Sequence, residues 1–159
     1  MPALSPSARL ARMIAEYPPE IAALGTAVLR RLRRILPPAH EMVYDNYNFL
    51  VVGFSPSERP SAAVLSLVFA PHRISVCFLF GRRVPDPNRL LSGGGKRVRF
   101  LRLPDPTLLD DPRVRALLAR ALESGPVRFG RRSRRTLVIR SVSARRRPRR
   151  PATKPETSR

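Results

Sequence analysis

The sequence predicts an α+β domain of two layers, in which helices cover one face of an antiparallel sheet. Helical periodicity occurs at the start of the chain and again after residue 111, whereas the segment between holds several contiguous strand-like runs. Consecutive strands joined by short turns pair antiparallel. The chain shows no alternation of strand and helix, which argues against a doubly wound nucleotide-binding fold.

Two helices are predicted before residue 37. Ser7 is the expected N-cap of the first, and Pro18-Pro19 ends it. Its apolar face is formed by Leu10, Met13, Ile14 and Tyr17. Pro19 and Glu20 suit the first turn of the second helix, because the missing N–H costs nothing there and the acid faces the positive helix end. An apolar stripe over residues 21–35 continues this helix until Pro37-Pro38.

The middle of the chain is rich in strand signals. The expected strands lie at residues 42–54, 62–69, 73–80, 98–103 and 136–142. The first of these runs is either two short strands around a bend at Asp45-Asn46 or one strand entered through a turn. Between the last two, Asp111-Pro112 starts a helix as N-cap and first helical residue, and Gly125-Pro126 ends it.

The chain is expected to form a single domain over residues 7–142, after a loose N-terminus at 1–6. Residues 143–159 form a basic tail rich in Pro and Arg, with almost no apolar residues, and are expected to be disordered. The net charge is +20, and residues 126–159 hold 13 basic residues against 1 acidic. Since no apolar run reaches the roughly 18 residues of a membrane span and no secretory signal is visible, we expect a cytoplasmic protein without membrane partners.

Catalytic motifs are absent from the sequence. Cys77 is the only cysteine, and we expect it to be a small buried residue on a strand. The positions of His40 and His72 give no indication that either histidine activates Cys77 as a nucleophile. The chain has no metalloprotease helix motif and no nucleophile elbow. The sequence therefore predicts a protein that is not an enzyme, without a metal site or an identifiable cofactor.

The glycine-rich stretch over residues 90–100, LLSGGGKRVRF, resembles a phosphate-binding loop but lacks its spacing. A Walker motif ending at Lys96 needs a glycine where Leu90 stands and Ser or Thr where Arg97 stands. A strand follows, whereas a phosphate cradle needs a helix N-terminus. What remains is a turn that needs the φ freedom of glycine, or a small anion site in which Gly93, Gly95, Lys96 and Arg99 take part.

Two other groups of residues offer weaker signals. Tyr44 and Tyr47 flank Asp45-Asn46 and either line a pocket or pack in the core. Glu41 and Asp45 lie four residues apart in a strand, so that they share a face. The basic residues Arg30, Arg31, Arg33 and Arg34 form either a solvated face or an anion-binding surface.

The middle of the chain resembles the YdhG-like family, a bacterial domain of unknown function. The likeness rests on four blocks in order: EMVYDNYNFLVVGFSPSERPS, VCFLFGRRVPDPNRLLSGGGKRVRFLRL, DDPRVRALLARAL and LVIRSVSARRRPRRP. It covers roughly residues 9–151. The resemblance implies a small α+β domain comparable with frataxin and no established catalytic residues.

The resemblance directs attention to a set of candidate ligand-binding residues. They are Tyr44, Asp45, Asn46, Tyr47, Asp86, Gly93, Gly95, Lys96 and Arg99. Our main hypothesis is that the regions 44–47 and 93–99 bind a small anionic ligand or a protein partner, with Tyr and Asn giving hydrogen bonds and Lys96 and Arg99 an anionic contact.

Two alternatives remain open. Nucleic acid would bind Arg30–Arg34 and the arginines of the tail, which are Arg145, Arg146, Arg147, Arg149 and Arg150. By analogy with the family, a frataxin-like iron chaperone is the other. That role needs clustered carboxylates, and the first two helices offer only Glu16 and Glu20 among many arginines.

Overall fold

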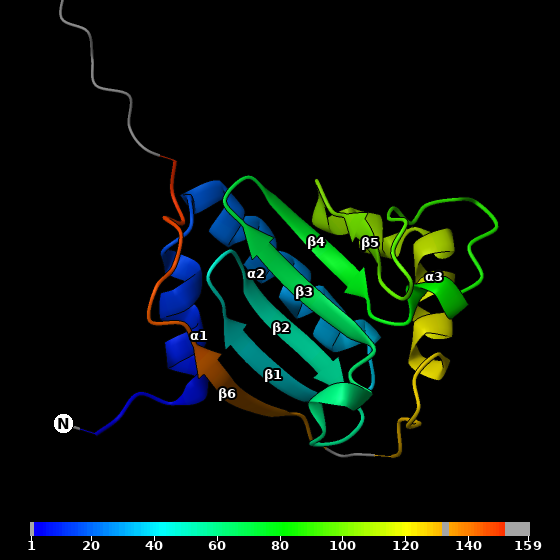
Figure 1. The fold of residues 1–159 in the computed structure, drawn as a ribbon, viewed down its shortest axis with the longest axis horizontal. Helices are drawn as coiled ribbons and strands as arrows, with labels where there is room; N and C mark the ends of the chain where they lie inside the picture. Colours follow the sequence, from blue (N-terminus) through cyan, green and yellow to red (C-terminus); the bar gives the residue numbers. More distant parts are fainter. Residues whose placement is uncertain (1, 132–133, 152–159) are drawn as a thin grey trace, which may run out of the picture.

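The computed structural model describes residues 2–131 and 134–151, which fold into a sheet with helices on one face (Figure 1). The helices are α1 (Pro6–Ala15), α2 (Pro19–Ile35) and α3 (Pro112–Glu123). The strands are β1 (His40–Asp45), β2 (Leu50–Ser55), β3 (Leu65–Ala70), β4 (Arg73–Phe78), β5 (Arg99–Arg102) and β6 (Thr136–Val142). Three short 3₁₀ turns, η1 (Pro60–Ala62), η2 (Gly81–Arg83) and η3 (Pro106–Asp110), lie between them. The predicted α+β class with helices on one face is confirmed.

The sheet is mixed rather than purely antiparallel. Its strand order is β5-β4-β3-β2-β1-β6, and every neighbouring pair is antiparallel except β1 and β6, which run parallel. The prediction of an antiparallel sheet is therefore wrong at this edge. The reason is that β6 enters only after α3, so that the chain has crossed the sheet before it pairs with β1.

The element boundaries follow the sequence signals closely. Residues 42–54 contain two strands, β1 and β2, as one of the two readings of that segment proposed. Asp111 caps α3 through its side chain, which accepts a hydrogen bond from the backbone N–H of Arg113 at 2.8 Å. The first helix differs: its N-cap is Ser5, whose Oγ accepts from the N–H of Ala8, and not Ser7.

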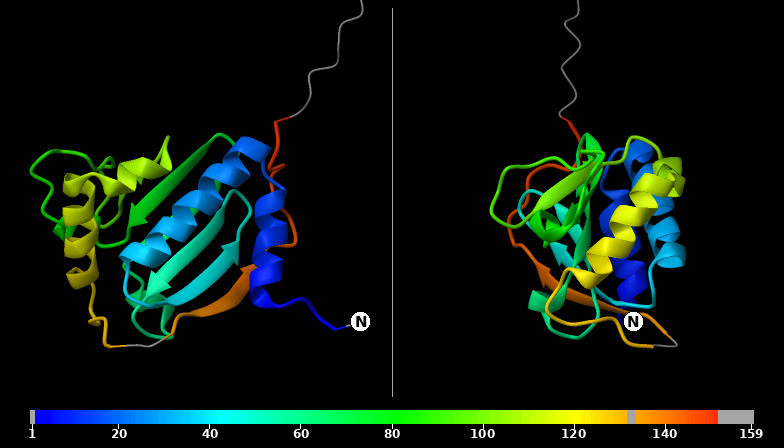
Figure 2. Two further views of the ribbon diagram at one scale, coloured as in Figure 1. Left: turned by 180° about the vertical axis from the view of Figure 1, so that it is seen from behind. Right: turned by 90° about the vertical axis from the view of Figure 1, so that its right-hand side faces the viewer.

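The core lies between the sheet and the helices. Figure 2 shows the three helices together on one side of the sheet, with α2 running across the back of the central strands. One row of register illustrates the packing, since the fully buried residues Val43, Val52, Leu67 and Val76 lie side by side on the helix side of β1 to β4. Glu41 and Asp45 point to this same side of β1, as their spacing predicted.

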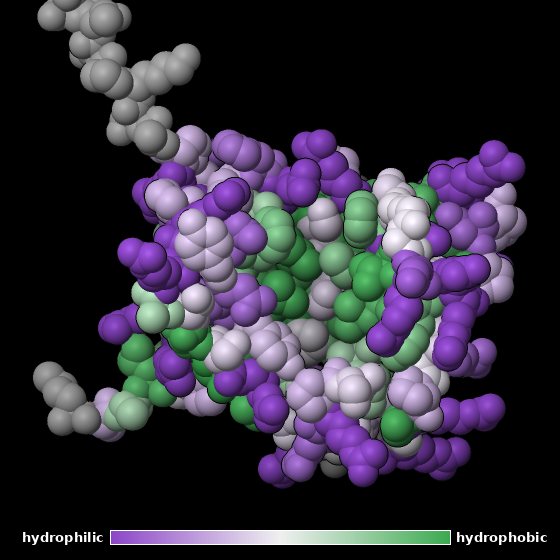
Figure 3. Space-filling model, viewed as in Figure 1, coloured by the Kyte–Doolittle hydropathy of each residue, from purple (hydrophilic) through white to green (hydrophobic). Residues whose placement is uncertain are grey.

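The opposite face of the sheet carries no helix within the described residues. Small residues lie at its centre, where Gly53, Ser66 and Cys77 occupy one row of register between Met42 and Phe100. Figure 3 looks onto this face and shows apolar side chains over the strands, with hydrophilic side chains around them.

Candidate functional site

The two segments in which we expected one ligand site lie far apart. Four strand steps of about 4.8 Å separate β1 from β5, which places them about 19 Å apart in the sheet. They also lie at opposite ends of the strands, because residues 44–47 lie at the end of β1 whereas residues 93–99 lead into the start of β5, which runs in the same direction as β1. The expectation that both segments line one pocket is therefore wrong.

The glycine loop is held by its own hydrogen bonds. Gly93 has φ +115°, a conformation that glycine adopts without strain, so the turn interpretation of this residue is confirmed. The Nη1 of Arg99 donates to the carbonyl oxygens of Gly95 and Val98 at 2.6 and 2.8 Å. The carboxylate of Asp86 accepts the backbone N–H groups of residues 90 and 91, both at 2.9 Å. Arg99 and Asp86 thus shape the loop.

Lys96 lies in a different setting, a hollow of about 390 Å³ lined by basic residues. The lining consists of Phe80, Arg82, Arg83, Lys96 and Arg97. The guanidinium of Arg97 lies 4.7 Å from the centre of the Phe80 ring, and that of Arg83 lies 5.7 Å from it. No acidic residue contributes to this lining, so the hollow is a concentrated positive surface.

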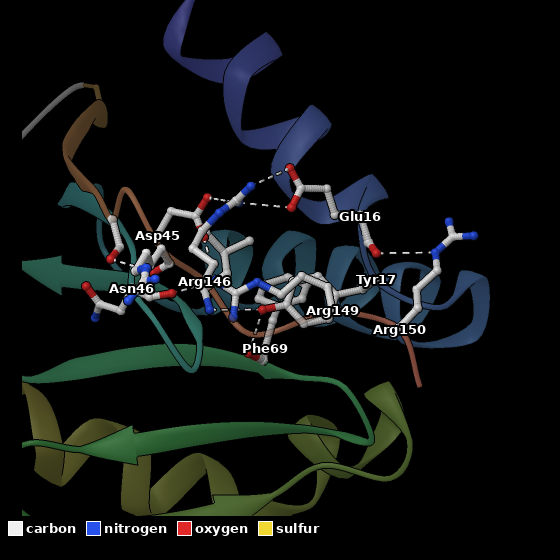
Figure 4. Close-up of polar contacts among 11 residues, drawn as sticks. Glu16, Tyr17, Asp45, Asn46, Phe69, Arg146, Arg149 and Arg150 are labelled. Atoms are coloured by element: carbon white, nitrogen blue, oxygen red, sulfur yellow. Dashed lines mark hydrogen bonds and ion pairs between the residues drawn. The ribbon is translucent and has the colours of Figure 1, made fainter. Parts of the chain in front are cut away.

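At the other end of the sheet, Asp45 is the centre of an ion-pair cluster (Figure 4). Asp45 is 1% exposed, and its carboxylate faces two arginines from beyond β6. Oδ2 accepts from Nη1 of Arg146, and Oδ1 accepts from Nη2 of Arg149 at 2.7 Å. The same Nη2 also donates to the backbone carbonyl of Asn46 at 2.6 Å. Two of the candidate ligand-binding residues, Asp45 and Asn46, therefore serve to hold arginines in place.

These arginines belong to residues 144–150, which we call the arginine segment. We expected residues 143–159 to be disordered, and the structure contradicts this for 143–151; residues 152–159 lie outside the described residues. Two backbone hydrogen bonds of 2.8 Å hold the arginine segment in place: Ser143 N, directly before the segment, donates to the carbonyl of Asp45 at the end of β1, and Arg147 N donates to the carbonyl of Tyr47 in the β1–β2 loop. Composition predicted disorder because apolar residues are scarce, but buried charge pairing replaces apolar packing here.

Arg149 is the most buried member of the segment, at 5% exposure. Its guanidinium lies 5.4 Å from the centre of the Tyr17 ring, which supports the cation through its π face. Nε and Nη1 of Arg149 are buried and have no hydrogen-bond partner among the described residues. These two atoms carry three N–H donors, and each unsatisfied buried donor costs on the order of 1–3 kcal/mol.

The segment also contacts the carboxyl end of α1. Arg146 Nη1 lies 2.9 Å from Oε2 of Glu16, and Arg150 donates to the backbone carbonyls of Ala15 and Glu16, each at 3.2 Å. Positive charge at this end of a helix is favourable because the last carbonyls are unpaired and carry the negative end of the helix dipole. Glu16, Ala144 and residues 146–150 surround an open hollow of about 610 Å³.

Tyr17 is a site residue that sequence reasoning missed, since its spacing placed it in the apolar face of the first helix. It is fully buried, and its hydroxyl donates to the carbonyl of Phe69 and accepts from the N–H of Leu50, both at 3.0 Å. Burial raises the pKa of the Tyr17 phenol above its usual value. The sequence feature that could have identified Tyr17 is its position directly before Pro18-Pro19, where the chain turns between two helices.

The remaining candidates of this region lie near its surface. The Tyr44 hydroxyl donates to Sδ of Met42 at 3.8 Å, on the open face of the sheet. Tyr47 is 49% exposed, and the guanidinium of Arg147 lies 5.7 Å from the centre of its ring. Arg145 is exposed and does not line the hollow.

Two of the arginines near the end of α2 take part in ion pairs that join secondary-structure elements. Arg33 holds the buried carboxylate of Glu41 through three hydrogen bonds of 2.7 to 3.1 Å, and Arg31 pairs with Asp110 of η3. The prediction that the four arginines form only a solvated face is therefore wrong for Arg31 and Arg33. They connect α2 to β1 and to η3, whereas Arg30 and Arg34 remain exposed.

Comparisons with known proteins do not assign a family. No family model, no curated protein and no solved structure matches this chain. Among residues 2–131 and 134–151, no group of three or more His, Cys, Asp or Glu side chains is placed to hold a metal ion. In the same residues, no helix is both long and apolar enough to cross a membrane.

Proposed function

We propose that this protein is a non-enzymatic binding domain that holds a small oxyanion, a phosphate or carboxylate group, in the hollow beside the arginine segment. The observation that carries the proposal is that Nε and Nη1 of Arg149, in a buried guanidinium, have no hydrogen-bond partner among residues 2–131 and 134–151. Oxygen acceptors from an anion would satisfy these donors with charge-assisted hydrogen bonds, which are the stronger kind.

The charge balance around the hollow supports the same ligand class. Arg146, Arg147, Arg149 and Arg150 line it, and only Glu16 among the lining residues is acidic. Even with Asp45 counted beside it, the cations exceed the carboxylates by two. Guanidinium groups stay protonated at neutral pH and do not exchange protons with a substrate, so their chemistry is that of binding and orientation.

We also propose that the chain is related to the YdhG-like family and that it acts in the cytoplasm. The LVIRSVSARRRPRRP block that contributes to the resemblance contains all of β6 except Thr136, together with the arginine segment. If this block binds the ligand, its role explains why the basic residues after β6 accompany the folded domain.

The experiment is isothermal titration calorimetry with inorganic phosphate, pyrophosphate and citrate at low ionic strength. Arg147→Gln and Arg150→Gln remove exposed cations that line the hollow, and each is expected to weaken binding about tenfold. Arg145→Gln is the matched control, because Arg145 lies in the same segment but does not line the hollow. Equal weakening by Arg145→Gln, or no binding of any of the three anions, contradicts the proposal.

A second candidate function is binding of the nucleic-acid backbone at the hollow that contains Lys96. The specific observation in its favour is the lining of that hollow: its described residues include four cations and no acid, and two of the cations, Arg83 and Arg97, lie over the Phe80 ring. The tail alone is a poorer candidate than its composition suggested, because Arg146 and Arg149 are engaged with Asp45.

Filter binding of a single-stranded oligonucleotide over a range of salt concentrations tests this candidate. The double variant Lys96→Gln, Arg97→Gln should lower both the affinity and the dependence of affinity on salt, since about one counterion is released for each phosphate contact. An unchanged salt dependence in that variant rules out the hollow as the contact.

A further inference from the structure

The open face of the sheet contains a pocket that is separate from both basic hollows. It has a volume of about 360 Å³ and lies over β3, β4 and β5, on the side away from the helices (Figure 3). Its lining residues are Phe49, Val68, Ala70, Arg73, Ser75, Cys77, Ser92, Phe100 and Arg102. Alternate residues of β4, namely 73, 75 and 77, point to this face, which explains why one strand supplies three of them.

The lining combines apolar surface with positive charge. Phe49, Val68 and Phe100 supply apolar walls, and both phenylalanines are more than one third exposed although they are large apolar side chains. Phe100 is fixed because its strand is paired on both sides: with Cys77 of β4, and with Ser92 through two backbone hydrogen bonds of 2.8 and 2.9 Å. The pocket wall is therefore set by the sheet rather than by a free loop.

Two cations lie at this pocket without a carboxylate to neutralise them. Arg102 stands opposite Ser75 in the β4–β5 register, and Arg73 stands at the start of β4. Neither forms an ion pair with another described residue, and no acidic residue lines the pocket. By contrast, the arginines at Asp45 and at Glu41 each face a carboxylate.

We propose that this pocket binds a small apolar carboxylic acid, with its hydrocarbon part against Phe49, Val68 and Phe100 and its carboxylate between Arg73 and Arg102. Charge complementarity selects the acid, since two guanidiniums stand beside an apolar surface and have no negative partner in the described part of the chain. The volume falls within the range of roughly 300–1,000 Å³ that is typical of small-molecule sites. This site goes beyond the function proposed above and does not depend on it.

The test uses 4-phenylbutyrate as the probe and isothermal titration calorimetry as the measurement. We expect binding to the wild-type chain, and at least tenfold weaker binding for the double variant Arg73→Gln, Arg102→Gln. Arg140→Gln is the control, because Arg140 is an exposed arginine of β6 outside the pocket. The neutral analogue 4-phenylbutanamide should also bind at least tenfold more weakly than the acid.

Cys77 gives an independent readout of location, since it is the only cysteine and lines the pocket. Saturating 4-phenylbutyrate should slow alkylation of Cys77 by iodoacetamide several-fold, and the Arg73/Arg102 double variant should lose this protection. Burial raises the pKa of the Cys77 thiol, so the assay is run at pH 8.5 or above to obtain a measurable rate.

Several results overturn the proposal. They are a lack of binding by the wild-type chain, equal affinity for the acid and the amide, unchanged affinity in the Arg73/Arg102 variant, or no protection of Cys77. Concentration-dependent dimerisation that is abolished by Phe100→Ser would show instead that a second copy of the chain covers this face. Arg150→Gln separates the two proposals, because it should weaken phosphate binding and leave 4-phenylbutyrate binding unchanged.

Discussion

The guanidinium of Arg149 lies 2.7 Å from the carboxylate of Asp45, although 104 residues separate them in the chain. Both side chains are almost fully buried, and β6 delivers the arginine segment to this position by pairing with β1, the strand that ends in Asp45. The contact therefore joins the last described segment of the chain to its first strand. The stability of the domain therefore depends on the arginine segment, although the composition of that segment predicts disorder.

We expect Asp45→Asn to lower the free energy of unfolding by about 3 kcal/mol, because it leaves a buried guanidinium without its counter-charge. Urea denaturation followed by circular dichroism measures this. Arg149→Met added to Asp45→Asn should recover part of the loss, since the unpaired charge is then removed. Glu58→Gln is the control at an exposed carboxylate in the loop after β2. A loss below about 1 kcal/mol for Asp45→Asn would contradict the importance of the pair.

Tyr17→Phe should lower stability by about 1–3 kcal/mol. The variant keeps the ring that supports Arg149 but removes the hydroxyl that bridges Leu50 N–H and the Phe69 carbonyl, leaving two buried backbone groups unpaired. Tyr47→Phe at a half-exposed position is the matched control and should change stability by less than about 0.5 kcal/mol. Equal urea midpoints for the two variants would show that the bridge contributes nothing.

Gly25→Ala should destabilise the domain although alanine favours helices by about 1 kcal/mol over glycine. A Cβ at Gly25 would lie 2.0 Å from Cε1 of Phe69, so α2 must move away from β3 or the ring must leave its place, at a cost of about 1–3 kcal/mol or more. Gly94→Ala, where nothing lies within 4 Å, is the control. If Phe69→Leu makes room, the double variant should lose less stability than the two single losses added together.

The charge of the Asp111 carboxylate should stabilise the fold at neutral pH, and this contribution should be lost in acid. Hydrogen bonds from Arg113 lower the pKa of Asp111 from 3.8 to about 2. A carboxyl group with a lowered folded-state pKa stabilises fully above its unfolded value, and loses this contribution as the pH falls from about 4 to about 2. Asp111→Asn retains a capping side chain without the charge. The stability difference between wild type and variant should shrink over that pH interval, and a constant difference would be inconsistent with the lowered pKa.

Local features were the most predictable. The start of α3 follows from Asp111-Pro112, because an N-cap and a first-turn proline act within a few residues. The strand predicted at residues 73–80 likewise contains β4, in which the alternate residues Ile74, Val76 and Phe78 are buried. Such signals need no knowledge of what lies across the sheet.

The candidate site was less predictable because it depends on strand order. The sequence singles out Asp45, but it predicts disorder for the segment of its partners Arg146 and Arg149. It also predicts the apolar face of a helix for Tyr17, whose ring lies beside Arg149. The proximity of segments 44–47 and 93–99 was expected from their shared family resemblance. A resemblance of sequence blocks carries no information about the distance between them.

The sequence by itself determined the fold class, the starts of α2 and α3, the strand faces and the excess of positive charge, since each follows from local propensity, periodicity or composition. Only the tertiary structure decided that β6 pairs parallel with β1 and that β1 and β5 are separated by three strands. That topology decides which charges meet: it buries Arg149 against Asp45 and leaves Arg73 and Arg102 without a carboxylate at the open face. The physical reason is that ion pairing acts over a few ångströms in space, whereas the sequence specifies separation along the chain.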